Sequence, residues 1–370
     1  MNKRLLTSGG NIIYMLLLGI WMLQSCRNDR TSVAPTNVQL TTEISNDGSG
    51  YVKFMATADN AKYYYISFGD VSGATPFKSI SGVADHIYNN SGNYEVVVTA
   101  NTNEQVFTSF STSISVSLNV PIPSGGYTSA SSYNGMTLTK AEEFSTSSID
   151  PSNWTFEIGD GCPNCGWGNN ELEFYTSQNA FIQDGYLIIK AKVESRQGKS
   201  YTSSRMTTKD KFTFTYGRVD VRAIIPKGQG LWPAIWMLGS NINTVGWPAC
   251  GEIDIMEMIG GNGREKTVYG TAHWNDGGYK SSGGSKTLSQ GLFSDAFHVY
   301  SIEWTDSNIN WLIDDVSYYS VPITTYNAAF NKDFFFILNV AVGGNWPGSP
   351  DGTAKFPQIM IVDYIRVFQK

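Results

Sequence analysis

The sequence predicts an all-β protein, on two observations. Charged residues make up 16% of the chain and aromatic residues 13%, and glycine, serine, threonine and asparagine are plentiful, which is typical of loop-rich β proteins. The apolar runs have the length of strands, are separated by turn residues, and often alternate with polar positions. The net charge of -6 comes with no basic block, which argues against a nucleic-acid partner and favours a neutral or cationic one.

The first 25 residues read as a signal peptide. Lys3 and Arg4 form a positive n-region, and the apolar run from Ile12 to Leu23 is too short to span a bilayer comfortably. The run ends in Leu-Gln-Ser-Cys, which resembles the lipobox of bacterial lipoproteins, so Cys26 is expected to be lipidated; an ordinary signal peptide is the alternative. We therefore expect export and anchoring to the outer membrane, on its periplasmic or cell-surface side, through a short tether at 26–32.

The other cysteines suggest a small disulfide loop. Cys162 and Cys165 lie in "GCPNCG", and an exported chain favours a disulfide between them. A zinc site is the alternative, but it needs about four ligands, and the histidines are only His86, His273 and His298. Cys250 precedes an apolar strand and is expected to be a buried small hydrophobic residue.

Residues 33–119 are predicted to form a small β module, because short alternating strands such as "YVKFMATA" and "NYEVVVTA" follow one another. "YYYISFGD" and "HIYNNSGNYEVVVTA" resemble the PKD-type immunoglobulin-like domain, which implies a spacer or, alternatively, a module that helps to bind polysaccharide. A segment rich in proline, serine and glycine at 120–135 reads as a linker.

Residues 136–370 are predicted to form one large domain of two packed antiparallel sheets. About ten strand-length runs, including "YGRVDVRAII", "LWPAIWML" and "FFFILNVAV", are separated by turn signals. Many of them alternate so that one face is polar or aromatic, which favours a sandwich.

Three carboxylates gather in "GEIDIMEMIG". In a strand, Glu252 and Asp254 share one face, while Glu257 should point to the other. A β-bulge at Ile255 and Met256 would shift the parity and return Glu257 to the face of the other two. The sequence therefore predicts a bulged strand that carries a row of acids.

Such a row suits glycoside hydrolysis. Repulsion between like charges raises at least one pKa, which would leave a neutral acid beside an anion, and this reaction needs that pair. A calcium site or a solvated strand face are the alternatives, but calcium prefers scattered loop oxygens. A serine hydrolase is excluded, because no Gly-x-Ser-x-Gly elbow is present.

"GEIDIMEMIG" resembles the bulged signature of glycoside hydrolase family 16, and the likeness runs through most of the large domain, including "GWGNNELEFYT" and "ILNVAVGGNWPG". The resemblance implies a concanavalin-like β-jelly-roll sandwich, preceded by the small immunoglobulin-like β-sandwich domain, and a retaining endo-acting enzyme. It implies Glu252 as nucleophile, Glu257 as general acid/base and Asp254 as the assisting residue. The likeness is to the laminarinase branch, which cuts β-1,3-glucan; a mixed-linkage β-glucanase, an agarase or carrageenase, and a non-catalytic lectin are the alternatives.

A neutral polysaccharide cleft needs aromatic rings on which sugar faces stack. Trp232 and Trp236 are four residues apart on one predicted strand and point the same way. By the family resemblance, Asn170 and Arg205 bind sugar hydroxyls and His273 lies near the leaving group; each also has a purely structural interpretation.

The resemblance also implies one structural calcium ion, held by Glu143, the carbonyl of Gly185 and Asp363. An ion pair or simple capping is the alternative at these positions. No cofactor is expected for catalysis, and the protein is expected to act as a monomer on a neutral β-glucan.

Overall fold

The computed structural model describes residues 32–45, 48–88 and 90–370. The predicted signal peptide, Cys26 and most of the predicted tether lie outside the described residues. No helix within these three ranges is both long and apolar enough to cross a membrane. The described chain divides into two compact units. The first contains the described residues up to Thr42, together with Phe54–Ala84 and Glu95–Ser113, and the second contains Ile114–Lys370 together with the described residues of 43–53 and 85–94.

The strands between residues 36 and 116 form two small sheets, and the predicted domain bounds 33–119 stay a prediction. Within the described residues one sheet has the order β1-β2-β5 and the other β4-β3-β6-β7. Alternation explains the packing, because Val52, Phe54 and Ala56 of β2 are buried while the residues between them are more exposed. The likeness to a PKD-type domain stays a prediction. The strands are β1 (Thr36–Ile44), β2 (Tyr51–Asp59), β3 (Tyr63–Ser67), β4 (Phe77–Ser79), β5 (Val83–Ile87), β6 (Gly92–Asn103) and β7 (Val106–Val116).

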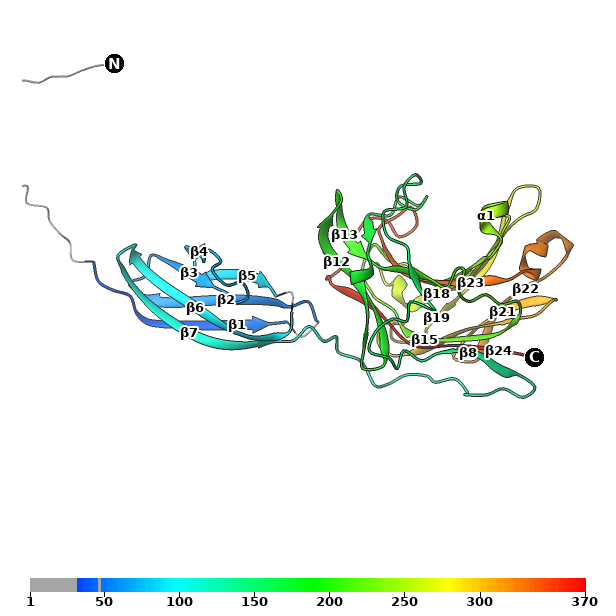
Figure 1. Ribbon diagram of the computed structural model, residues 1–370, viewed down its shortest axis with the longest axis horizontal. Helices are drawn as coiled ribbons and strands as arrows, with labels where there is room; N and C mark the ends of the chain where they lie inside the picture. Colours follow the sequence, from blue (N-terminus) through cyan, green and yellow to red (C-terminus); the bar gives the residue numbers. More distant parts are fainter. Residues whose placement is uncertain (1–31, 46–47, 89) are drawn as a thin grey trace, which may run out of the picture. The chain divides into compact units, whose positions relative to one another are not determined.

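Most of the second unit is a sandwich of two sheets that face each other (Figure 1). The first, here called the back sheet, has the order β10-β13-β12-β24-β15-β20-β21-β22, with β11 beside β12 and β8 beside β24. Its strands are β8 (Thr137–Glu142), β10 (Glu173–Tyr175), β11 (Ala180–Gln183), β12 (Tyr186–Arg196), β13 (Lys199–Ser203), β15 (Gly217–Ile224), β20 (His298–Trp304), β21 (Asn308–Ile313), β22 (Val316–Pro322) and β24 (Gln358–Gln369).

The second sheet, here called the cleft sheet, has the order β19-β18-β17-β16-β23-β14-β9. Its strands are β9 (Thr155–Phe156), β14 (Arg205–Thr207), β16 (Leu231–Gly239), β17 (Glu252–Glu257), β18 (Thr267–Asn275), β19 (Tyr279–Thr287) and β23 (Phe334–Val342). The helical segments of the second unit are short: α1 (Ile242–Val245) and the 3-10 turns Ser177–Asn179, Arg264–Lys266 and Thr325–Asn331. The predicted jelly-roll sandwich is confirmed.

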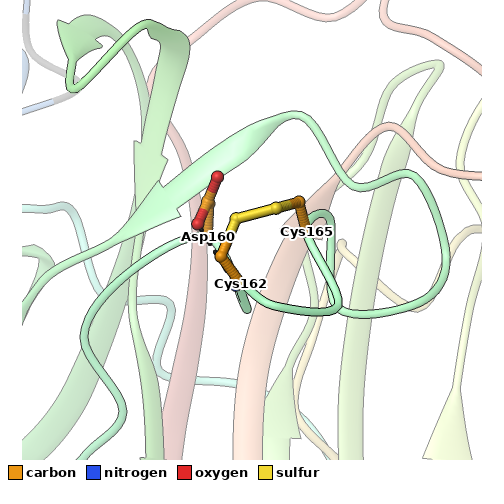
Figure 2. Close-up of side chains that lie close together, drawn as sticks. All are labelled: Asp160, Cys162 and Cys165. Carbon is orange, nitrogen blue, oxygen red and sulfur yellow. Dashed lines mark hydrogen bonds between the residues drawn. A yellow bond between two sulfur atoms is a disulfide. The ribbon is translucent and has the colours of Figure 1, made fainter.

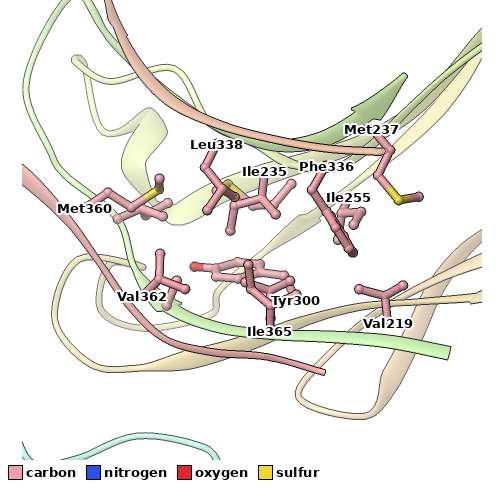
Figure 3. Close-up of a cluster of buried hydrophobic side chains, with 14 of the residues drawn as sticks. Val219, Ile235, Met237, Ile255, Tyr300, Phe336, Leu338, Met360, Val362 and Ile365 are labelled. Atoms are coloured by element: carbon pink, nitrogen blue, oxygen red, sulfur yellow. The ribbon is translucent and has the colours of Figure 1, made fainter. Parts of the chain in front are cut away.

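The core lies between the two sheets, and strands of both sheets contribute alternate residues to it (Figure 3). From the cleft sheet, Ile235 and Met237 of β16 and Phe336 and Leu338 of β23 point inward; Val219, Tyr300, Met360, Val362 and Ile365 come from the back sheet. This alternation leaves the other residues of β16 and β23 on the opposite face of the cleft sheet.

The predicted linker at 120–135 contacts the back sheet. Tyr127 donates its backbone N–H to the Phe297 carbonyl over 2.8 Å, and the hydroxyl of Tyr133 donates to Asp220 over 2.7 Å. Ser129 is buried and bonds the Tyr364 hydroxyl. Residues 120–135, here called the strap, therefore lie along the back sheet and do not form a free linker. The aromatic side chains of the strap have polar partners on the sheet.

Tyr133→Phe is expected to lower the stability of this unit by about 1–3 kcal/mol, because it removes a donor from a buried carboxylate. Asp220 is fully buried, and Arg218 and Ser301 bond its other oxygen. The measurement is denaturant unfolding of the full chain, with Tyr326→Phe as the control, since Tyr326 is 70% exposed. Equal midpoints for the two variants would contradict a role for the strap in stability.

Candidate active site

A cleft of about 790 Å³ lies over the cleft sheet. The side chains of the cleft sheet that point away from the core form the floor of the cleft, and loop residues form its rim. The residues lining it include Trp232 and Trp236 on β16, Glu252, Asp254 and Glu257 on β17, Thr271 and His273 on β18, Tyr279 on β19, Arg205 on β14, Asn339 on β23, and the loop residues Trp167, Asn169, Glu171, Trp247 and Trp346.

The predicted β-bulge is present on β17. Against β18, Glu252 pairs with His273 and Asp254 with Thr271, but Glu257 pairs with Tyr269. Three steps on β17 therefore match two on β18, which leaves one extra residue in β17. Ile255 and Met256 both lie in the buried core, so the strand resumes with Glu257 on the cleft face.

A bond from the back sheet holds the bulge in place. The indole N–H of Trp311 donates to the backbone carbonyl of Asp254 over 2.8 Å, and Trp311 itself is fully buried. Where the ladder is irregular, a carbonyl needs another donor. The core therefore stabilises the irregularity that brings the three acids together.

Each glutamate accepts a hydrogen bond from a different tryptophan. Trp247 donates its indole N–H to Glu252 Oε2 over 3.0 Å, and Trp232 donates to Glu257 Oε1 over 2.9 Å. Asp254 is only 3% exposed and lies beside His273, whose Nε2 is 3.0 Å from Asp254 Oδ2. The two outer acids are thus oriented by indoles and the central one faces an imidazole.

Burial raises the pKa of all three carboxyls. The pKa of Glu257 rises to about 8, with a further rise from the Asp254 charge and opposing effects of Trp232 and His273. Burial raises the pKa of Asp254 to about 8 as well, and that of Glu252 well above its usual value, with Asp254 raising the latter further. The predicted repulsion between the acids raises the pKa of Glu252 and of Glu257, but loss of water contact contributes more.

All three pKa values move in the same direction, and the largest cause of each is burial. For Glu252, the bond from Trp247 and the proximity of His273 both lower the pKa against the larger effect of burial.

A raised carboxyl pKa also changes how the free energy of unfolding depends on pH. For Glu257 this free energy falls as the pH rises from the unfolded-state pKa of about 4.5 to the folded-state pKa of about 8, because the folded chain retains its proton longer.

The prediction that Trp232 and Trp236 point the same way is confirmed, because both line the cleft. Trp346 packs edge-on against Trp232, with ring centroids 5.6 Å apart. Trp236 donates its indole N–H to Asn339 Oδ1 over 2.8 Å. Both rings therefore keep an aromatic face in the cleft while their polar ends are satisfied.

Arg205 lies in the cleft wall, where its guanidinium is 4.3 Å from the Trp167 ring centroid and 4.8 Å from that of Trp236. Its Nε donates to Glu157, so its charge is matched by a partner. Asn170 is not among the lining residues; it donates to Asn345 over 2.8 Å, and its neighbour Asn169 lines the cleft instead. The loop reverses direction here, and strand parity does not predict which asparagine faces inward.

The family model described as glycosyl hydrolases family 16 matches residues 167–366, which is more than half of the chain. The chain belongs to glycosyl hydrolase family 16. The matched segment includes the bulged strand and most of the residues that line the cleft.

Relatives and solved structures agree with this assignment. The chain is 41% identical over 251 residues to the beta-glucanase of Rhodothermus marinus, which covers 63% of this chain and 85% of that protein. It is 39% identical over 223 residues to the clotting factor G alpha subunit of Tachypleus tridentatus, covering 59% of this chain but only 32% of that protein. The laminarinase catalytic domain of Thermotoga maritima MSB8 is 46% identical, with a TM-score of 0.59, over 64% of this chain and 98% of that one.

A disulfide closes the loop that enters the cleft. Cys162 and Cys165 are bonded to each other, as predicted, and Asp160 lies beside them (Figure 2). Residues just after the bridge, among them Trp167 and Asn169, line the cleft. Cys250 is a buried free thiol, also as predicted.

The residues predicted to hold calcium lie where β8 and β12 meet β24. β12 pairs with β24 up to Val362 and β8 pairs with it from Ile365, so Asp363 falls between. Glu143 bonds Arg366 through both carboxylate oxygens, at 2.7 and 2.9 Å, and Asp363 accepts a bond from Arg222. The structure therefore has ion pairs here, and calcium binding stays a prediction in which the ion would compete with two guanidinium groups.

Trp247 and Tyr279 are functional candidates that sequence reasoning missed. Trp247 lies on the loop before β17 and bonds Glu252, while the Tyr279 hydroxyl bonds His273 Nδ1 over 2.8 Å. Their rings pack together with centroids 5.3 Å apart. The one available signal was proximity, since Trp247 precedes Glu252 by five residues in "GWPACGEID".

Proposed function

We propose that the protein is a retaining, endo-acting glycoside hydrolase that cleaves internal β-1,3-glucosidic bonds of laminarin-like glucans. The observation that carries the proposal is the row of three buried carboxylates that a bulge turns into the cleft of a family 16 domain. The likeness to the Thermotoga maritima laminarinase supports the choice of substrate.

In the proposed mechanism, the Glu252 carboxylate attacks the anomeric carbon while Glu257 gives its proton to the departing glycosidic oxygen. A covalent glycosyl-enzyme forms. The Glu257 carboxylate then takes a proton from water, whose oxygen attacks the same carbon and releases Glu252. His273 Nε2 lies 3.7 Å from Glu252 Oε1 and 3.0 Å from Asp254 Oδ2, so that His273 and Asp254 position the Glu252 carboxylate between the steps.

The charge of the cleft favours a neutral substrate over a sulfated galactan. Of the described residues that line it, Arg205 is the only arginine or lysine, and Glu157 matches its charge. Binding sulfate would call for cations without an internal partner. Aromatic rings, by contrast, are abundant there and suit the apolar faces of glucose units.

The decisive experiment is product analysis on laminarin, lichenan, agarose and carrageenan. Rapid appearance of a range of oligosaccharides from laminarin, with the β-anomer formed first in a proton NMR time course, supports the proposal. Preferential cleavage of lichenan would favour the mixed-linkage alternative. Binding of laminarin without any product would favour a lectin.

The pH dependence tests the role of Glu257. Its pKa of about 8 makes kcat/KM fall as the pH rises through that value, because the general acid loses its proton. Trp232→Phe removes a bond that favours the carboxylate, so this limb should move to higher pH. Trp236→Phe is the matched control, since its indole bonds Asn339. An equal shift in both variants would remove Glu257 from the acid role.

We propose further that Cys26 carries a lipid anchor to the outer membrane and that residues 33–119 act as a PKD-type spacer. The lipobox-like sequence at 23–26 and the β module support these proposals. Mass spectrometry of the mature N-terminus from native cells tests the first proposal, since it should find a lipid on Cys26. Cell fractionation adds a second test, because Cys26→Ser should release the protein from the membrane fraction. Glucan pull-down with residues 33–119 deleted tests the second, and lost binding would favour a polysaccharide-binding module.

A further inference from the structure

Three donor atoms from different side chains converge at the carboxylate row. One possible ligand atom from each of Glu252, Asp254 and His273 lies within 4.8 Å of the other two. His273 Nε2 is 3.0 Å from the aspartate oxygen and 3.7 Å from the glutamate oxygen. Ligands of a tetrahedral zinc ion with bonds of about 2.1 Å lie about 3.4 Å apart. The two distances from His273 Nε2, 3.0 and 3.7 Å, therefore lie on either side of that spacing.

Asp254 supplies a second, independent observation. Its Oδ2 is buried and has no hydrogen-bond partner among the described residues, although the residue is only 3% exposed. His273 Nε2 is 3.0 Å from this oxygen, but the two atoms do not form a hydrogen bond. A buried acceptor without a donor is costly, and a cation between the two atoms would satisfy both.

The other charges leave room for such a cation. Of the ion pairs in the described chain, only those with His273 involve Glu252 or Asp254. The nearest indole, that of Trp247, bonds the other oxygen of Glu252, Oε2, and leaves Oε1 available. No lysine or arginine ion pair would have to be broken in this part of the described structure.

The histidine is held as a metal ligand would be. Its Nδ1 is 2.8 Å from the Tyr279 hydroxyl, and the two rings stack at an interplanar angle of 16°. When Nδ1 carries the proton and donates it to Tyr279, Nε2 keeps a lone pair that can bind a cation, 3.0 Å from Asp254 Oδ2 and 3.7 Å from Glu252 Oε1. Metal-binding histidines usually donate their other ring N–H in this way, which fixes the ring and the tautomer.

We propose that Glu252, Asp254 and His273 form a binding site for a divalent transition-metal ion of the zinc class, with Tyr279 as the positioning residue for His273. Two carboxylates and one imidazole suit zinc, whereas calcium and magnesium prefer six or more oxygen ligands. The ion would occupy Glu252 Oε1 and so block hydrolysis reversibly. This last consequence rests on the proposed function, but binding itself does not.

A second group of candidate ligands, Asp160, Cys162 and Cys165, must be kept apart from this site. Zinc binds the thiolate form of cysteine, and in this structure the two sulfurs are bonded to each other (Figure 2). In non-reducing buffer we therefore expect a single zinc equivalent, at the cleft.

The test is a competition titration of the metal-free full chain with zinc chloride and a fluorescent chelator, without reductant. The wild type should bind one equivalent. His273→Gln should weaken binding by about 100-fold or more, and Tyr279→Phe by about 10- to 100-fold, as expected for a residue that orients a ligand. His298→Gln is the matched control, because it also removes a histidine beside an aspartate, at 2.7 Å from Asp314 on the back sheet. Its Kd should equal that of the wild type.

No binding by the wild type, or an unchanged Kd in His273→Gln, would overturn the site. A laminarin assay under the same conditions adds the second arm: activity should fall with zinc occupancy and return with EDTA. Zinc bound without any loss of turnover would also overturn the proposal, since Glu252 would then be free. A wild type that binds zinc but cleaves no glucan would sink the proposed function and leave the metal site standing.

Discussion

Glu252→Gln is expected to abolish release of reducing ends from laminarin, by on the order of 10⁴-fold or more, since no covalent intermediate can form without the carboxylate. The amide keeps the shape of the side chain and can still contact the Trp247 indole, whose partner is Glu252 Oε2. Burial already raises the pKa of this carboxyl, so a neutral substitute should leave thermal unfolding and glucan binding nearly unchanged.

The control for this variant is Glu194→Gln on β12 of the back sheet, which makes the same chemical change outside the cleft and should keep full activity. Glu252→Ala adds a chemical test. Azide can enter the space left by the side chain and attack the anomeric carbon from the same face, which yields an α-glycosyl azide. Retained turnover in Glu252→Gln, or a β-glycosyl azide from Glu252→Ala, would take the nucleophile role away from Glu252.

Glu257→Ala is expected to lose laminarin hydrolysis by about 10²- to 10⁴-fold, the usual contribution of general acid–base catalysis. An aryl glycoside of laminaribiose with a good leaving group should be affected much less in its first step, because such a group departs without a proton. The glycosyl-enzyme should then accumulate, since no base activates water, and appear as an added glycosyl mass on the protein.

Azide separates Glu257 from Glu252. In Glu257→Ala it should attack the accumulated intermediate without help from a base and give a β-glycosyl azide, the opposite anomer from the Glu252 variant. Equal losses on laminarin and on the aryl glycoside would argue that Glu257 is structural. In that case the main role of Glu257 would be to accept the hydrogen bond that the Trp232 indole donates to its Oε1 over 2.9 Å.

Strand periodicity explains why so much of the site was predictable. Glu252, Asp254 and Glu257 are held by one strand, and counting residues along it showed that a bulge at Ile255 and Met256 would bring Glu257 to the face of the other two, as the structure has it. The same counting put Trp232 and Trp236 on one face. Where position follows from a period of two, a single sequence carries the information.

Loops and solvation do not follow such a rule. Asn169 rather than Asn170 lines the cleft, because the two lie in a turn, where side-chain direction does not alternate. Trp247 and Tyr279 reach the carboxylate row from outside β17. The main cause of the raised pKa values was missed as well, since like charges are visible in a sequence but the depth of burial is a property of the fold.

The strap at 120–135 changes where the hydrolase can safely be cut from the rest of the chain. A recombinant truncation starting at residue 136, the boundary suggested by composition, would strip Tyr127, Ser129 and Tyr133 from the sheet they cover. Val120 would go too, and with it one apolar neighbour of Ile188 and Ile361. A product that begins near Ile114 retains all of these, so poor yield of the shorter version would reflect a missing edge and say nothing about the enzyme's intrinsic solubility.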